Sequence, residues 1–153
     1  MIMEYSIVKV DKNNYLLFDE MVFYRKNGRE RSEKEKSEVI IDNMVYETLE
    51  DKNLYVFAAK MEEKFIGWVS AVYIPKISWT NGNGHLFIDE LWVNPNYRRK
   101  GIGHALMEKI ENIAKEINVI GLRLYANNEG KYLYEKCGYK SLNEATFMEK
   151  ILI

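Results

Sequence analysis

Hydrophobic and polar residues follow two periods along this chain, and together these periods predict an order of strands and helices. A period of two, or a run of β-branched and aromatic residues, predicts strands at residues 5–10, 54–59, 65–74, 86–93 and 119–125. A period near 3.6 predicts helices after Asn14, at 32–49, at 101–117 and at 129–136. One or two closing strands are expected within 139–153. This order predicts an α/β domain with a mixed, largely antiparallel sheet flanked by about four helices.

Two of these helices differ in how clearly the pattern defines them. The helix at 101–117 has regular apolar spacing, carried by Ile102, Ala105, Leu106, Ile110, Ile113, Ala114 and Ile117. The helix at 32–49 is predicted to bury a face made of Val39, Ile40, Met44 and Val45. The charged run that precedes it, at 25–36, is interpreted as a solvated connection.

Composition narrows the class of protein without naming a function. The chain has 153 residues, 47% of them hydrophobic, and a formal net charge of −1, so a single domain over 1–153 is expected, with no nucleic-acid partner. No apolar run approaches the ~20 residues that cross a membrane. The single cysteine, Cys137, cannot form an internal disulfide. These features together predict a soluble cytoplasmic protein.

The segment from the strand at 86–93 into the helix at 101–117 has the chemistry of an anion site. A basic turn, Arg98-Arg99-Lys100, leads into Gly101-Ile102-Gly103 at the start of the helix. The first N–H groups of a helix have no intrahelical acceptor, and the helix dipole makes that end positive. Glycines allow a phosphate to approach the backbone closely. Taken alone, the same segment is also compatible with a tight turn. It lacks the lysine of a nucleotide P-loop and the third glycine of a dinucleotide fingerprint.

The run from Arg98 to Gly103 resembles the Arg/Gln-x-x-Gly-x-Gly/Ala signature of the GNAT acetyltransferase superfamily, and its lead-in from Leu91 to Arg98 is similar as well. The resemblance implies a GNAT fold and a coenzyme A pyrophosphate held by backbone N–H groups. The cofactor-binding stretch would then comprise Arg98, Arg99, Lys100, Gly101, Ile102 and Gly103. It also implies that the main chain of Leu91 and Val93 pairs with the pantetheine arm, and that the oxyanion donor is an N–H of Trp92 or Val93.

A second signature follows at the spacing that one helix and one strand require. Residues 127–139, NNEGKYLYEKCGY, are similar to the family pattern Asn-x-x-Ala-x-x-Leu-Tyr-Glu-Lys-x-Gly-Phe/Tyr and depart from it at Gly130, where alanine is usual. The resemblance implies that Asn127 binds the coenzyme arm, and that Tyr134 binds near the coenzyme sulfur and protonates the leaving thiolate. Without the resemblance, Asn127 is a turn residue and Tyr134 a packed side chain.

Acetyl transfer to an amine also needs a base, because an alkyl ammonium with a pKa of ~10.4 is almost fully protonated at pH 7. Asp89 and Glu90 are the candidates, since carboxylates inside an apolar strand are unusual. Strict alternation would place Asp89 with Leu91 and Val93, and Glu90 with Ile88 and Trp92, but a β-bulge would change these faces. The sequence does not choose between the two carboxylates. Cys137, His85 and His104 are expected to be structural.

These patterns predict an acyltransferase that moves acetyl from acetyl-coenzyme A directly to the primary amine of a small molecule, without a metal. The alternatives are a protein N-terminal or lysine acetyltransferase, a non-catalytic coenzyme A-binding module, and a nucleotide-binding domain. Members of the family are often dimers, so a homodimer is compatible with the resemblance. The acceptor would be selected by the first two helices, the turn around Trp79 and the closing strands.

Overall fold

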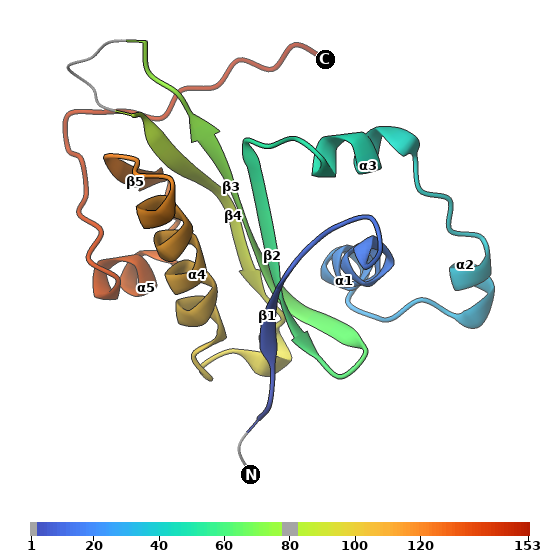
Figure 1. Cartoon of the computed structure of the whole chain (residues 1–153). Helices are drawn as coiled ribbons and strands as arrows, with labels where there is room; N and C mark the ends of the chain where they lie inside the picture. Colours follow the sequence, from blue (N-terminus) through green and yellow to red (C-terminus); the bar gives the residue numbers. More distant parts are fainter. Residues whose placement is uncertain (1–2, 78–82) are drawn as a thin grey trace.

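The computed structural model describes residues 3–77 and 83–153, which form a central sheet with helices on both faces (Figure 1). The strand order is β1-β2-β3-β4-β5. The strands are β1 (Ser6–Lys9), β2 (Leu54–Met61), β3 (Lys64–Ile74), β4 (His85–Val93) and β5 (Gly121–Leu124). Neighbours are antiparallel except β4 and β5, which are parallel. The mixed, largely antiparallel sheet predicted from the sequence is therefore confirmed.

Five α-helices and a short 3-10 helix surround the sheet in the described residues. They are α1 (Tyr15–Asn27), α2 (Glu33–Ser37), α3 (Asn43–Leu49), η2 (Pro95–Tyr97), α4 (Ile102–Glu116) and α5 (Lys131–Lys136). In Figure 1, α1, α2 and α3 lie on one side of the sheet, and α4 and α5 on the other. Each face of the sheet has its own hydrophobic core, and alternate side chains of β2 contribute to each. Val56 and Ala58 pack with Met21 of α1 in one core, whereas Phe57 and Ala59 pack with the buried residues of α4 in the other.

The regular spacing of α4 produces the larger core. Its buried residues are Ile102, Leu106, Met107, Ile110 and Ala114. Burial of a large apolar side chain contributes about 1.5–3 kcal/mol, so this one stripe fixes α4 firmly against the sheet. The sheet in turn fixes where α4 begins, and this start is the end of the helix that the candidate site uses.

The single helix predicted at 32–49 is wrong, because two short helices and an extended link occupy that segment. Ser32 and Glu35 form a capping box that starts α2, and the Asp42 side chain accepts a hydrogen bond from the Met44 N–H to start α3. Side-chain caps of this kind compete with a continuous helix. The prediction that this helix buries an apolar face is also wrong, since Ile40 is 92% exposed and Met44 is 68% exposed.

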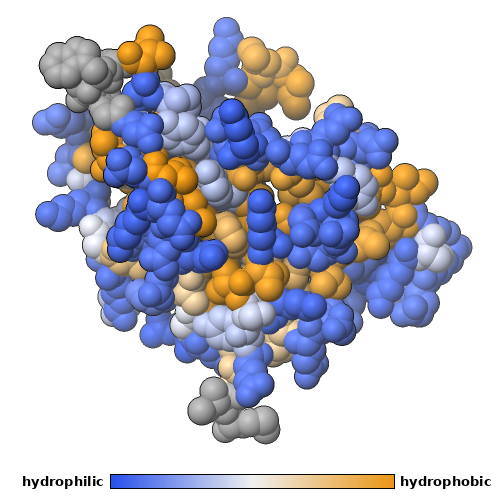
Figure 2. All heavy atoms as spheres, in the orientation of Figure 1, coloured by the Kyte–Doolittle hydropathy of each residue, from blue (hydrophilic) through white to orange (hydrophobic). Residues whose placement is uncertain are grey.

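The closing strands predicted within 139–153 are also absent from this fully described segment, which continues as extended chain without ladder pairing. Its apolar side chains are exposed, among them Leu142, Phe147, Met148, Ile151, Leu152 and Ile153. At its start, Tyr139 packs against the core, and further along the Phe147 ring lies 4.5 Å from that of Tyr125, just beyond β5. Figure 2 shows hydrophobic surface at the top of the molecule, where the C-terminal segment crosses in Figure 1.

None of the helices in the described part of the chain has the length and apolar character needed to cross a lipid bilayer. The predicted turn around Trp79 falls in residues 78–82, outside the described residues.

Candidate active site

A β-bulge in β4 decides which way its side chains face. Ser70 of β3 pairs with Glu90, but the next residue, Ala71, pairs with Ile88, so Asp89 is the extra residue. Ile88, Leu91 and Val93 consequently belong to the core on the α4 face, while Trp92 packs in the core on the α1 face. The prediction that strict alternation groups Ile88 with Trp92 is therefore wrong, and the bulge considered as its alternative is present.

Beyond the bulge, one edge of β4 is free of strand pairing in the described chain. The parallel ladder with β5 ends where Ile88 pairs with Leu124. β5 stops there, whereas β4 continues to Val93. The main chain from Asp89 to Val93 therefore has β3 on one side only. An extended ligand can add to such an edge by backbone hydrogen bonding, which is the pairing expected for Leu91 and Val93.

The free edge leads through η2 into the basic loop at 98–101. Arg98 is anchored by its Nε–H, which donates to the carbonyl of Val93 at 2.9 Å, and Arg98, Arg99 and Lys100 are all exposed. Arg99 and Gly101 have left-handed backbone with φ of 64° and 82°. A Cβ on Gly101 would meet no atom within 4 Å, so space is open beside the backbone where α4 begins. Successive N–H groups at such a loop form an anion-binding concavity.

Gly103 brings the two sequence motifs and β4 together. A Cβ on Gly103 would lie 3.1 Å from Leu133 Cδ2 of α5 and 3.9 Å from Val93 Cγ2 of β4. The absence of a side chain at Gly103 thus lets α5 approach the first turn of α4. Ile102, by contrast, is 1% exposed and packs in the core, so only its main chain can contact a ligand.

Tyr134 is held on the inner side of α5. Its ring is half-buried and packs at 6.1 Å from the Tyr139 ring. Burial raises the pKa of the Tyr134 phenol above its ordinary value of 10.0, and Cys137 adds to the shift. The phenol therefore stays protonated at neutral pH and can donate a proton. Asn127 caps the same turn, because its Oδ1 accepts from the Gly130 N–H at 2.8 Å.

Cys137 is nearer to a histidine than its sequence position suggests. Its Sγ lies 3.5 Å from Nδ1 of His104 on α4. Burial raises the pKa of the Cys137 thiol above its ordinary value of 9.0, and Glu111 adds to the shift. A nucleophilic cysteine needs a lowered pKa, so this pair has the electrostatics of a structural thiol. His85 is buried at the start of β4, and burial lowers its pKa, so it stays neutral.

Glu90 has a partner that the sequence analysis missed. Arg25 of α1 donates from Nη1 to Glu90 Oε2 at 3.0 Å, and its guanidinium carbon lies 5.1 Å from the centre of the Trp68 ring. Arg25 belongs to the charged run interpreted as a solvated connection, and no spacing in the sequence links it to a residue 65 positions later. Asp89 is exposed at the bulge.

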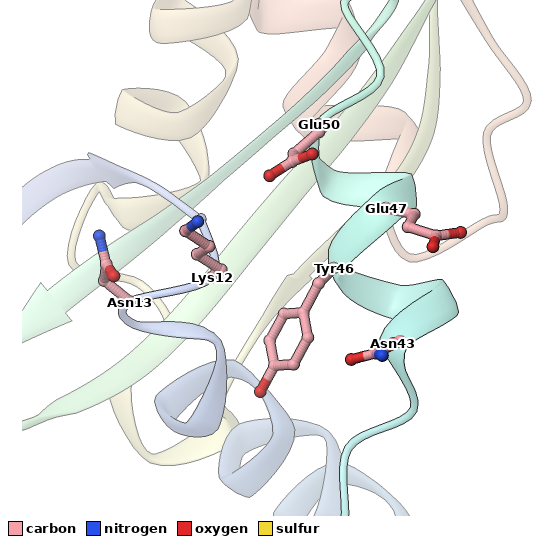
Figure 3. A pocket seen from close by; sticks show the side chains of 6 residues that line it. All are labelled: Lys12, Asn13, Asn43, Tyr46, Glu47 and Glu50. Carbon is pink, nitrogen blue, oxygen red and sulfur yellow. The ribbon is translucent and has the colours of Figure 1, made fainter.

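Two cavities lie apart from the basic loop at 98–101. A cavity of about 410 Å³ opens between the β1–α1 connection and α3, lined by Lys12, Asn13, Asn43, Tyr46, Glu47 and Glu50 (Figure 3). It shares no residue with either motif, and Figure 1 places α3 at the end of the sheet opposite the start of α4. A smaller cavity of about 240 Å³ includes His104 and Cys137 between α4 and α5.

Comparison with known proteins identifies the family of the chain. The model of the acetyltransferase (GNAT) family matches residues 17–139. Streptothricin acetyltransferase A of Bacillus subtilis is 34% identical over 83 residues, 54% of this chain and 44% of that protein. Thialysine N-epsilon-acetyltransferase of Sus scrofa is 30% identical over 71 residues, 44% of this chain and 41% of that protein. The chain spans less than half the length of the curated relatives it matches.

Solved structures share the fold at low sequence identity. An aminoglycoside acetyltransferase from an uncultured soil metagenomic sample superposes with a TM-score of 0.77 at 18% identity, covering 97% of each chain. Glucosamine-6-phosphate N-acetyltransferase from Arabidopsis thaliana gives a TM-score of 0.74 at 18% identity, covering 98% of this chain and 99% of that one.

Proposed function

Because this chain belongs to the acetyltransferase (GNAT) family, we propose that it transfers acetyl from acetyl-coenzyme A directly to the primary amine of a small molecule. The observation that carries the proposal is the continuity of one surface. The unpaired edge of β4 after Ile88 runs into the exposed basic loop and the N-terminus of α4.

The residues along this surface fit acetyl-coenzyme A. The main chain of Leu91 and Val93 pairs with the extended pantetheine arm, and the main chain of Trp92 lies between them on the same strand. Arg99, Lys100 and the N–H groups from Gly101 to Gly103 bind the pyrophosphate, while Arg98 fixes the loop to β4. The open space beside Gly101 supports this assignment, because a phosphate needs close approach to the backbone. Asn127 supplies its side-chain amide to the arm from the turn that it caps.

Three groups of the chain act on the reacting atoms. A carboxylate of β4, Glu90 or Asp89, accepts the proton that the attacking ammonium must lose. The N–H of Trp92 or Val93 stabilises the negative charge that develops on the thioester oxygen. The Tyr134 phenol donates its proton to the departing sulfur as the C–S bond breaks and the N–C bond forms. The position of Tyr134 on α5, which packs against the first turn of α4 at Gly103, supports this role, and the phenol carries its proton at neutral pH.

A small cationic amine is the acceptor class that we favour. Two relatives are named for acetylation of streptothricin and of thialysine, both small molecules. A carboxylate on an otherwise apolar strand suits an ammonium group. We place the protein in the cytoplasm, where its single cysteine would stay reduced.

We also propose a homodimer, formed by the exposed apolar C-terminal segment of each copy. The exposed side chains of Leu142, Phe147, Met148, Ile151 and Leu152 support this choice, since apolar surface left uncovered in one copy can be buried against a second copy. Sedimentation of the full chain against a chain ending at residue 144 tests it. A monomer in both cases overturns this proposal.

Thiol release measured with a thiol-reactive dye tests the activity. The protein is incubated with acetyl-coenzyme A and a panel of diamines, amino acids and peptides with free N-termini. Release that requires a small amine supports the proposal, and release that requires a peptide favours the protein acetyltransferase. Binding of acetyl-coenzyme A without release in any mixture would indicate a non-catalytic module.

A further inference from the structure

Arg25 joins α1 to the face of β4 on which Glu90 lies beside two packed indole rings. Its Nη1 lies 3.0 Å from Glu90 Oε2, and its guanidinium carbon lies 5.1 Å from the Trp68 ring centre. Trp68 pairs with Trp92 across the β3–β4 ladder, and their rings lie 5.2 Å apart. A carboxylate beside an indole face is the environment that binds an organic cation. In the structure, the cation is the protein's own guanidinium.

The guanidinium is held at the edge of the protein and not inside it. The Arg25 and Glu90 side chains are 47% and 48% exposed. Trp68 is only 3% exposed, so the arginine covers an indole that is otherwise part of the core. Ion pairs and cation–π contacts at exposed positions are weak. A cation from solvent can therefore replace Arg25 on Glu90 and Trp68 at modest cost.

We infer that Arg25 holds the place of the acceptor's ammonium group. The inference rests on the proposed function and extends it to the identity of the acceptor subsite, which consists of Glu90, the Trp68 face and the neighbouring Trp92. An aliphatic primary ammonium displaces the Arg25 guanidinium and pairs with Glu90. Glu90 takes one proton from it, leaving the neutral amine whose nitrogen bonds to the acetyl carbon while the C–S bond breaks.

Product release follows from the same competition. Acetylation converts the cation into a neutral amide, which gains neither the ion pair with Glu90 nor the cation–π contact with Trp68. The Arg25 guanidinium keeps both contacts, so it returns to Glu90 and excludes the product. The subsite therefore selects cationic alkylamines over neutral aromatic amines. It also predicts that removal of Arg25 strengthens the binding of a cationic acceptor.

The variant Arg25→Gln tests the inference, with Arg29→Gln as its matched control. Arg29 also makes an ion pair, to Glu35 at 2.8 Å, and lies 5.2 Å from the Phe23 ring, and both of these partners lie outside β4. The probe is 1,4-diaminobutane, titrated by calorimetry into each protein with and without coenzyme A. Loss of the two weak competing contacts should tighten its binding about fivefold in Arg25→Gln and leave Arg29→Gln unchanged.

Equal or weaker binding in Arg25→Gln would overturn the inference and leave Arg25 as a packing residue. If Arg25→Gln does not fold, Arg25→Lys serves in its place. This variant keeps the positive charge but loses the planar stacking of the guanidinium on the indole, so a smaller gain in affinity for 1,4-diaminobutane is expected. KM for the diamine should fall in parallel. Failure of the protein to bind acetyl-coenzyme A would overturn the proposed function instead, and the amine titration without coenzyme distinguishes the two failures.

Discussion

The Tyr134 ring occupies the space where a side chain at Gly130 would begin. A Cβ on Gly130 would lie 2.8 Å from Tyr134 Cε2 and 3.3 Å from Asn127 Oδ1. Carbon atoms not bonded to each other are normally 3.5–4.0 Å apart, so the ring would have to move. The glycine that departs from the family pattern is therefore matched to the position of the proposed proton donor in this chain.

Replacing Gly130 with alanine should separate stability from activity. Gly130 has ordinary right-handed backbone, with φ of −84°, so alanine fits the backbone and should change stability by no more than ~1 kcal/mol, because a gain in helix propensity is offset by the contact with the Tyr134 ring. The displaced Tyr134 ring should lower kcat by about tenfold to a hundredfold. Thermal unfolding and steady-state kinetics measure the two effects. An unchanged kcat would show that the position of the ring does not matter.

Tyr134 should titrate above its ordinary range. The ultraviolet absorbance of tyrosinate in the wild type, minus that in Tyr134→Phe, should show ionisation above pH 10. Because the folded-state pKa is raised, this group's contribution to stability is fully present below pH 10 and is lost as pH rises through the folded pKa. Tyr134→Phe should also lower kcat by at least about tenfold. A difference spectrum with a midpoint at or below pH 10 would contradict the burial described for this phenol.

The two carboxylates of β4 should differ in their importance. Glu90→Gln should lower kcat/KM for a diamine about a hundredfold, because Glu90 both binds the ammonium and accepts its proton. Asp89→Asn should have a smaller effect, since Asp89 is the extra residue of the bulge and the proposed ammonium subsite is built on Glu90. Parallel kinetics on both variants decide the assignment. The reverse order of effects would make Asp89 the base.

Cys137 should be dispensable for the chemistry. Its thiol pKa is raised by burial and by Glu111, so the thiolate that an acyl-enzyme requires is scarce at neutral pH. Cys137→Ala should retain kcat within about twofold. Mass spectrometry of the wild-type protein after incubation with acetyl-coenzyme A should find no acetyl group on the protein. Stoichiometric acetylation of Cys137 would replace direct transfer with a two-step mechanism.

The parts of the fold that the sequence predicted are those specified by local or strictly periodic signals. The regular apolar spacing of α4 predicts which of its residues are buried. The basic run with Gly101 and Gly103 marks the loop before this helix. The bulge at Asp89 could only be raised as an alternative, since it depends on register with β3. Two carboxylates in an apolar strand were the signal that something unusual occurs there.

The features that the sequence did not predict depend on competition between local structures or on contacts between residues far apart in the chain. The apolar pattern of 32–49 suggested one helix, but the caps at Ser32 and Asp42 favoured two short ones. The apolar C-terminal segment suggested strands, yet it forms no ladder in the described sheet. Arg25 was not predicted because its partners, Glu90 and Trp68, are brought to it only by the packing of α1 on the sheet.

The central claim is that the loop before α4 binds acetyl-coenzyme A, and calorimetric titration of Gly101→Ala against Gly28→Ala tests it most directly. Both glycines have left-handed backbone, with φ of 82° and 70°, and a Cβ on either would meet no atom within 4 Å. Alanine should therefore cost each about 1–2 kcal/mol of stability. Only Gly101→Ala should weaken acetyl-coenzyme A binding, about tenfold or more, because its Cβ enters the proposed phosphate site. Equal affinity in both variants, or no binding by the wild type, would contradict the account.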